Sequence, residues 1–382
     1  MNLIKSLSEN NVLVSIGTGG VGKTTMSCAM AISIAHAKSA KVLVITIDPA
    51  KRLGSILSVD SIGHKPVKID HKKFFENDQT VNGEVHAITI DMSQGWDELV
   101  NRYSKSEKDA EKIFDNIMYQ NLTTRFTHSH DFIAMDQLYE YYYKGEYDYI
   151  VLDTPPMSQA YGFFDAPKIV SEFFGGKILN LIISPYKLTK SSKTSKIFDL
   201  ASQPFLLLAN KVLGKNFLND IGEFFYLFKK MYDPILERSN EINMFLKSES
   251  LDCVLISNPI QYIENTFIEA KKELQDREMT LNDLIVNMTP YSESDYLEVS
   301  KYLESEANAN LEQSFIEFLR SDINMYEELD VKFKQNNNNT KSSSFKDREQ
   351  LKVYPIPKSF ETDLTKRLTN LVKLVLESNS TK

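Results

Sequence analysis

The sequence has few cysteines, no long apolar run and no excess of positive charge. Its two cysteines, Cys28 and Cys253, form no C-x-x-C pair, which excludes a disulfide framework and a cysteine zinc site. Apolar runs such as Phe205–Ala209 fall far short of the ~18 residues of a membrane helix, and the N-terminus shows no leader pattern. We therefore expect a cytoplasmic protein that binds no zinc.

Charge and composition further limit the class of protein to which the chain can belong. The 382 residues include 44 lysines and arginines against 52 aspartates and glutamates, a formal net charge of −8. A general nucleic-acid binder needs a surplus of cations to neutralise phosphates, so we expect no nucleic-acid partner. The hydrophobic content of 42% is enough for a large core, in one large α/β unit or in two coupled ones.

Short apolar runs rich in β-branched residues recur along the chain. They lack clean alternation, which is typical of strands buried on both faces of a parallel sheet, and stretches of helical period such as Met26–His36 separate them. The pattern predicts an α/β sheet with crossover helices. The expected strands are Val12–Ile16, Val42–Ile47, Ala87–Ile90, Tyr149–Leu152, Cys253–Ile256, Leu284–Val286 and Leu351–Tyr354.

Strand signals disappear between about residues 165 and 250, where apolar residues recur at helical spacing. Examples are Phe217, Ile221, Phe224, Phe228 and Met231. We predict a helical subdomain at 165–250, inserted between two parts of the core at 1–164 and 251–382. A polar stretch at 335–345, which begins QNNNNTKSSS, is predicted to form a flexible loop because it cannot bury enough surface to offset its ordering entropy.

Four of the fourteen glycines fall within six consecutive residues. The run from Gly17 to Thr24, GTGGVGKT, satisfies G-x-x-x-x-G-K-[ST] between an expected strand and an expected helix. Such a loop wraps its backbone N–H groups around a phosphate at a helix N-terminus. Lys23 should reach the β- and γ-phosphates, and the Thr24 hydroxyl should bind Mg²⁺. The other predicted nucleotide-binding residues of the loop are Gly19, Gly20, Val21 and Gly22.

Two aspartates follow other expected strands. Asp153 ends the run YIVLD and is placed to hold a Mg²⁺-bound water. The alternative is an aspartate that only caps the next turn. Asp48 ends the run VLVITID, and Pro49 stops that strand. Asp48 is a candidate for orienting a water in line with the γ-phosphate, and a plain turn aspartate is the alternative.

Four segments, GTGGVGKTT, TIDPAKRL, DTPPMSQAYGFFDAP and LIVNMTP, together resemble the ATPase family that includes the arsenite-pump ATPase and the ATPase of guided entry of tail-anchored proteins. The resemblance implies a doubly wound, mostly parallel sheet of about seven to eight strands, of the deviant-Walker class of P-loop enzymes. It also implies binding of ATP, ADP and Mg²⁺, hydrolysis of ATP, and a homodimer or a heterodimer with a paralogue.

The resemblance also implies roles for single residues. Asp48 matches the family's switch I aspartate, which orients the attacking water beside Lys23, and Asp153 matches the switch II aspartate at the metal. Thr25 is expected to hold the phosphates together with Lys23 and Thr24. Asn287 matches an asparagine that pairs with the adenine edge, and Pro355 falls where the family places an adenine-covering loop. Asn287 could equally be a turn residue, and Pro355 could simply end a strand.

One position departs from the family pattern. The family's loop usually carries a lysine where this chain has Thr18, and that lysine reaches the phosphates of the other subunit. Such a cation can supply a factor of ~10³–10⁵ in rate, so dimer-coupled hydrolysis is placed in doubt. Lys51 and Arg52 are candidate replacements, with exposed loop cations as the alternative. The zinc clamp of some relatives is missing, and Cys28 is expected to be a packing residue.

The predicted helical subdomain suggests what the hydrolysis drives. In targeting relatives this region forms an apolar groove for a client's transmembrane helix, but the same pattern would arise if the region packed on itself or on a dimer partner. We expect hydrolysis to drive the handling or targeting of hydrophobic membrane-protein segments. The alternatives are the motor subunit of an anion-transport system and a low-turnover regulatory subunit paired with a paralogue.

Overall fold

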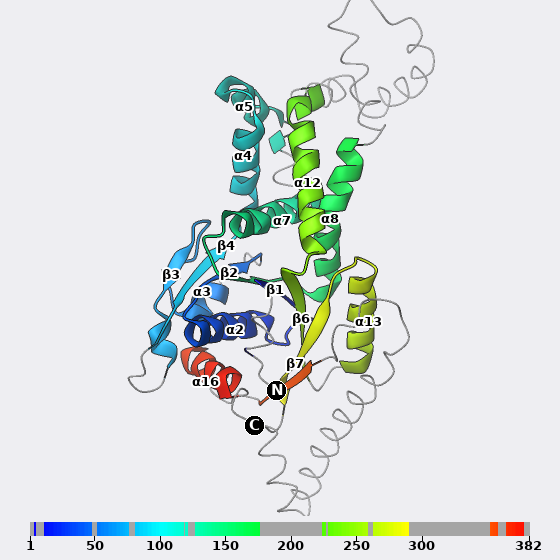
Figure 1. Ribbon diagram of the computed structural model, residues 1–382. Helices are drawn as coiled ribbons and strands as arrows, with labels where there is room; N and C mark the ends of the chain where they lie inside the picture. The colour runs from blue at the N-terminus through cyan, green and yellow to red at the C-terminus, as the bar shows by residue number, and fades with distance from the viewer. Residues whose placement is uncertain are drawn as a thin grey trace, which may run out of the picture. The chain divides into compact units, whose positions relative to one another are not determined.

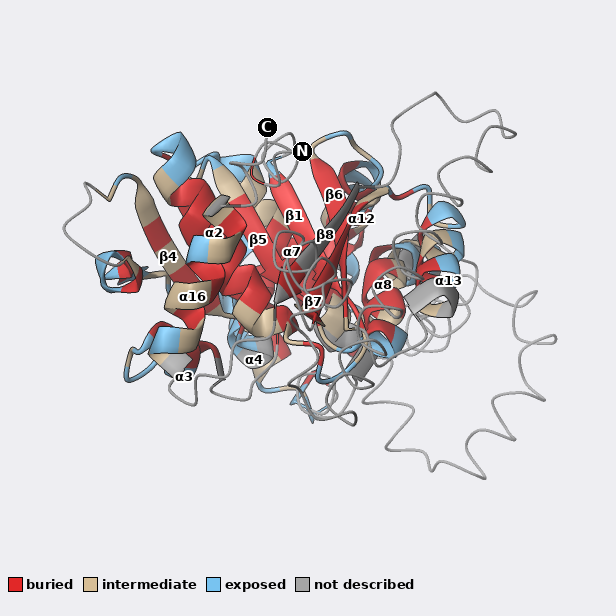
Figure 2. Cartoon of the chain, turned by 90° about the horizontal axis from the view of Figure 1, so that it is seen from below, coloured by how far each residue is buried: buried red, intermediate tan, exposed pale blue. Residues whose placement is uncertain are grey.

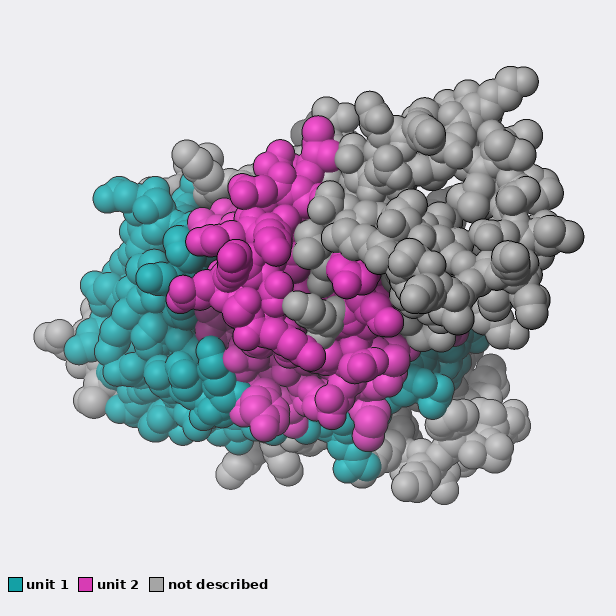
Figure 3. Space-filling model, turned by 90° about the horizontal axis from the view of Figure 1, so that it is seen from above, with its two compact units in different colours: residues 1–89, 144–160, 247–382 teal, residues 90–143, 161–246 magenta. Residues whose placement is uncertain are grey.

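The computed structural model describes residues 4, 11–47, 52–75, 81–117, 119–120, 127–175, 224–226, 228–258, 263–289, 352–357 and 364–377 (Figure 1). The chain divides into two compact units, coloured separately in Figure 3. The first unit comprises residues 1–89, 144–160 and 247–382, and the second unit comprises residues 90–143 and 161–246.

The first unit is built on a single sheet of eight strands in the order β3-β4-β2-β5-β1-β6-β7-β8. Neighbouring strands pair in parallel, except for β3, which pairs antiparallel with β4. The bounds are β1 Val12–Ile16, β2 Lys41–Thr46, β3 Val67–Ile69, β4 Glu84–Thr89, β5 Tyr149–Asp153, β6 Leu251–Ser257, β7 Leu281–Thr289 and β8 Lys352–Pro357. The strand order runs outward from β1 in both directions, which confirms the predicted mostly parallel, doubly wound α/β fold.

The central strands are buried on both faces, as their largely apolar sequences predict (Figure 2). Helix α2 (Lys23–Lys38) follows β1 and packs against β2 and β5. Its residues from Met26 to Ala35 are all buried, so this stretch of the helix is buried around its whole circumference and belongs to the core. The first unit also contains the short α3 (Arg52–Leu57), the 3₁₀ helix η1 (His71–Phe74) and α13 (Ile263–Gln275) between its strands.

The C-terminal helix α16 (Leu364–Glu377) packs against α2, α3 and η1. Its apolar stripe is buried, at Leu368, Leu371, Val372 and Val375. Thr365 also forms a hydroxyl hydrogen bond of 2.7 Å with Ser58, the residue that follows α3. The stripe therefore serves to dock this helix onto the first unit. In the described part of the chain, no helix is long and apolar enough to span a bilayer.

The second unit consists of helices in its described residues. They are α4 (Met92–Tyr103), α5 (Glu107–Phe114), α7 (Thr127–Lys144), the greater part of α8 (Met157–Gly175), η2 (Lys229–Met231) and α12 (Tyr232–Leu246). Contacts thus group residues 90–143 with the helical part of the chain, whereas the sequence placed them in the core. Residues 176–223 lie outside the described residues, so the subdomain bounds of 165–250 stay a prediction, as does the loop at 335–345.

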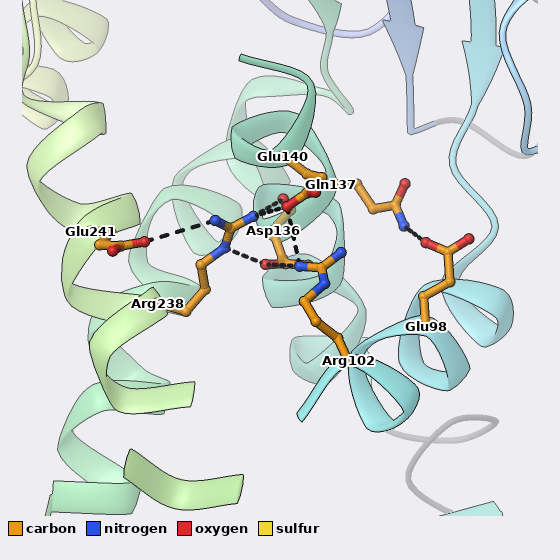
Figure 4. A network of polar contacts seen from close by, with 7 residues as sticks. All are labelled: Glu98, Arg102, Asp136, Gln137, Glu140, Arg238 and Glu241. Atoms are coloured by element: carbon orange, nitrogen blue, oxygen red, sulfur yellow. Dashed lines mark hydrogen bonds and ion pairs between the residues drawn. The ribbon is translucent and has the colours of Figure 1, made fainter. Parts of the chain in front are cut away.

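A network of buried charges ties three helices of the second unit together (Figure 4). Arg238 of α12 donates from Nε to the Asp136 carboxylate of α7 at 2.7 Å and from Nη2 to Glu140 at 2.6 Å. Arg102 of α4 reaches the other oxygen of Asp136 at 3.2 Å. The Asp136 side chain is 2% exposed and that of Arg238 is 8% exposed, and buried charges are tolerated when they are paired in this way.

Candidate nucleotide site

The carboxyl ends of β1, β2 and β5 meet at one edge of the sheet, where parallel α/β folds bind ligands. Asp153, the last residue of β5, lies beside Ser15 of β1 on one side and beside Thr46 of β2 on the other. The Thr46 hydroxyl donates to Asp153 Oδ2 at 3.2 Å, and Asp153 is 1% exposed. The predicted metal carboxylate is therefore buried and oriented next to the loop that follows β1.

The glycine-rich loop needs glycine at its two ends. Gly17 has φ 154°, and an added Cβ would lie 2.1 Å from the carbonyl oxygen of Ile256 on β6. Gly22, just before α2, has φ 85°, and an added Cβ would lie 2.5 Å from Asn287 Nδ2. A Cβ at Gly19 or Gly20 would meet nothing within 4 Å, but Gly20 has φ 81°, a conformation that also favours glycine. The loop thus packs firmly at both ends and is open on its middle.

Lys23 lies inside the curve of this loop. Its Nζ donates to the carbonyl oxygens of Gly17 at 3.0 Å and Thr18 at 2.9 Å, and the residue is 8% exposed. Thr24 and Thr25 follow on the first turn of α2 and are half-buried. No side chain caps this helix at Gly22, and its first turn carries no acidic residue. A helix N-terminus with an ammonium group beside it is suited to bind an anion.

The segment that follows Asp153 is bonded to the same loop. The Thr154 hydroxyl donates to the carbonyl oxygen of Ser15 at 2.7 Å. The backbone N–H of Met157, the first residue of α8, donates to the Gly17 carbonyl at 2.9 Å. The Gly17 carbonyl therefore accepts hydrogen bonds from both Lys23 and Met157, a link that nothing in the sequence motifs had indicated.

Asn287 lies against the loop from the end of β7 and is 4% exposed. Its Nδ2 donates to the Val21 carbonyl at 2.8 Å, and its Oδ1 accepts from the Met288 N–H at 3.0 Å. The predicted contact with the adenine edge stays a prediction, whereas the contact with the loop is present. The sequence motif LIVNMTP pointed to this residue but not to the loop carbonyl as its partner.

The other predicted site residues are only partly described. Asp48 and Lys51 lie outside the described residues. Arg52 begins α3 and Pro355 lies in β8, but the structure describes neither side chain. Thr18 is half-buried, and its carbonyl binds Lys23 as given above. The catalytic role of Asp48 and the replacement of the missing lysine by Lys51 or Arg52 therefore stay predictions.

Cys28 lies on the buried face of α2, one turn beyond the loop, and is 0% exposed. Burial, and to a lesser degree the nearby Asp153 carboxylate, raise the pKa of the Cys28 thiol well above its usual value. Because the thiolate is the form that binds metals and reacts, Cys28 stays a neutral packing residue at physiological pH, as predicted.

Comparison with known proteins places this site in a family. The sequence model described as anion-transporting ATPase matches residues 10–333. The chain is 25% identical over 284 residues to ATPase GET3 of Rhodotorula glutinis, covering 73% of this chain and 70% of that protein. It is 22% identical over 311 residues to ATPase get3 of Sclerotinia sclerotiorum, covering 79% and 80% of the two chains. It is 25% identical over 293 residues to ATPase get3 of Schizosaccharomyces pombe, covering 75% of each chain.

The match and the geometry agree. The matched region begins just before β1 and includes the phosphate loop, Asp153 and Asn287. It also includes the whole of the second unit. The chain therefore belongs to the anion-transporting ATPase family and is an ATP-hydrolysing enzyme.

Proposed function

We propose that the chain hydrolyses ATP with Mg²⁺ at the loop between β1 and α2. The observation that carries this proposal is the position of Lys23, whose ammonium group lies within a loop of backbone groups at an uncapped helix N-terminus. Phosphoryl transfer requires mainly positioning and charge stabilisation from the protein. A triphosphate in this loop would receive both from Lys23 and the loop N–H groups.

The residues present also fit the metal. Thr24 would bind Mg²⁺ through its hydroxyl, and Asp153 would hold the metal's water shell from the end of β5. When bound, Mg²⁺ supplies positive charge that stabilises the phosphate oxygens and the leaving group. Thr46 fixes the carboxylate of Asp153 for this role by its hydrogen bond of 3.2 Å. Asp48 is proposed to orient the attacking water.

Removal of the metal tests this proposal. We expect phosphate release from ATP to fall to background when EDTA is added and to return when Mg²⁺ is restored in excess. The measurement is steady-state release of inorganic phosphate, with thermal unfolding in the same buffers as a control for loss of fold. Release that continues unchanged in EDTA would contradict the assignment of Thr24 and Asp153.

We further propose that hydrolysis changes the second unit by way of α8. This helix begins at Met157, which is bonded to the Gly17 carbonyl, and the same helix continues into the second unit from Tyr161. When Lys23 moves from that carbonyl to a γ-phosphate, the carbonyl that accepts the Met157 N–H at the start of α8 loses its hydrogen bond from Lys23. Segments that respond to a γ-phosphate in this manner are a common basis for nucleotide switches.

The output best supported is the handling of hydrophobic membrane-protein segments, because the family includes the ATPase of guided entry of tail-anchored proteins. A dimer, of this chain or with a paralogue, is proposed from the same resemblance. Two alternatives have their own supporting observations. The family's description favours the motor subunit of an anion-transport system, which would co-purify with a membrane channel. Thr18 favours a low-turnover regulatory subunit, which would bind ATP but release phosphate slowly.

A further inference from the structure

Among the described residues, the Asn287 side chain forms two hydrogen bonds, and both are to backbone groups. Its Nδ2 donates to the Val21 carbonyl at 2.8 Å, and its Oδ1 accepts from the Met288 N–H at 3.0 Å. A carbonyl can only accept and an amide N–H can only donate, so the orientation of the carboxamide is determined by its neighbours. Asn287 is 4% exposed, and breaking such a buried contact leaves a polar group unsatisfied.

The backbone around Asn287 is shaped to hold this side chain. Met288 has φ 62°, a left-handed conformation that is uncommon for a residue other than glycine. The pairing of β7 with β8 shifts register between Asn287 and Thr289. Irregularities of this kind often redirect a side chain next to a functional site. On the other side, a Cβ at Gly22 would lie 2.5 Å from Asn287 Nδ2, so glycine is required for the carboxamide to approach.

The bond to Val21 has a consequence for the phosphate loop. The Val21 carbonyl and the Gly22 N–H belong to one planar trans peptide unit, and they therefore point in opposite directions. When Asn287 holds the carbonyl, the Gly22 N–H is turned away from Asn287. Gly22 directly precedes α2, where loop N–H groups are directed at the anion.

We infer that Asn287 is a positioning residue of the phosphate loop, which fixes the Val21–Gly22 peptide so that the Gly22 N–H faces the bound phosphates. This inference rests on the proposed binding of ATP in that loop. It differs from recognition of the base, because a contact with the loop affects every ligand that carries a polyphosphate. The carboxamide keeps one further N–H and one further lone pair with which it could contact a base. Positioning of the loop and recognition of the base are therefore separate roles, and ligands with and without a base distinguish them.

The test compares three ligands in the presence of Mg²⁺: ATP, GTP and inorganic tripolyphosphate, which has no base. Dissociation constants are measured by calorimetry for the wild-type protein, Asn287→Ala and the control Asn282→Ala. Asn282 lies on the same strand, five positions earlier, and its Nδ2 bonds to Asp252 at 3.0 Å. We expect Asn287→Ala to weaken all three ligands by one common factor of about tenfold, and Asn282→Ala to leave them unchanged.

Each other result has a definite meaning. If Asn287→Ala weakens ATP but leaves GTP and tripolyphosphate unchanged, Asn287 reads the base and the inference is overturned. It is also overturned if no ligand is affected. If the wild-type protein itself binds none of the three, the proposed ATP site fails instead, which separates the two failures.

A double-mutant cycle provides a second test. Gly22→Ala should weaken tripolyphosphate binding, in part because its new methyl group would lie against Asn287 Nδ2. Asn287→Ala removes that obstacle, so we expect the double variant to lose less than the sum of the two single losses. Fully additive losses would show that the two residues act independently and would count against the inference.

Discussion

Lys23→Ala is expected to lower kcat for ATP hydrolysis at least about a hundredfold. Lys23 is 8% exposed, and its ammonium group donates to two loop carbonyls at 3.0 and 2.9 Å. Its removal takes away a fixed positive charge where negative charge develops on the transferred phosphoryl group. Steady-state phosphate release at saturating ATP measures the loss.

The matched control for this substitution is Lys38→Ala. Lys38 lies in the last turn of the same helix, α2, and is exposed. The Lys38→Ala protein should therefore hydrolyse ATP at the wild-type rate, and Lys23→Ala and Lys38→Ala should unfold at similar temperatures. A Lys23→Ala protein that hydrolyses ATP at the wild-type rate would overturn the catalytic assignment.

Arg238→Ala is expected to lower the free energy of unfolding of the second unit by about 3–5 kcal/mol. The substitution removes the closest cation from Asp136, whose side chain is only 2% exposed. Arg102 remains at 3.2 Å but is itself 29% exposed, so it shields the carboxylate incompletely. A buried carboxylate without its partner is costly, and the loss should exceed that for any exposed ion pair.

The single tryptophan of the chain makes this measurement specific. Trp96 lies on α4 in the second unit and is 5% exposed, so its fluorescence during urea unfolding reports on that unit. The control is Glu241→Ala on the same helix as Arg238. Its carboxylate is 46% exposed and lies 3.7 Å from Arg238, so we expect a loss below about 0.5 kcal/mol. Equal midpoints for the two variants would contradict the importance of the buried network.

Much of the first unit could be predicted from sequence because its strands are apolar and continuous. The predicted strand Val12–Ile16 agrees with β1, and Tyr149–Leu152 differs from β5 by one residue. Strand β3 was missed because it has three residues, one of them an exposed lysine, and lies at the sheet edge. Short edge strands carry too little periodicity to be recognised.

The grouping of residues 90–143 with the second unit could not be predicted. Sequence periodicity shows that a segment is helical but not which helices it contacts. The bonds that hold this unit involve Arg102, Asp136 and Arg238, and charged residues in a sequence usually indicate a solvated surface. Their burial becomes evident only when the three helices are seen together in space.

The positions of the candidate site residues were predictable where they belong to a motif, whereas their roles stay predictions. Lys23, Thr24 and Asp153 lie at the carboxyl edge of the sheet, as the spacing of strand, loop and helix required. The partner of Asn287 was not predictable, because the contact joins residues 266 positions apart. The shared acceptor at Gly17 was missed for the same reason, since a backbone carbonyl has no signature in a sequence.

Capture of an apolar helix in two nucleotide states tests whether ATP hydrolysis is coupled to the handling of hydrophobic segments. The probe is a peptide with ~20 consecutive apolar residues, offered to wild-type protein with ADP and to Asp48→Asn with ATP. The latter variant is predicted to hold ATP without hydrolysing it. We expect the retained fraction to differ strongly between the two states and the difference to disappear in Lys23→Ala. Equal retention in both states, or none in either, would contradict the coupling of hydrolysis to the handling of hydrophobic segments.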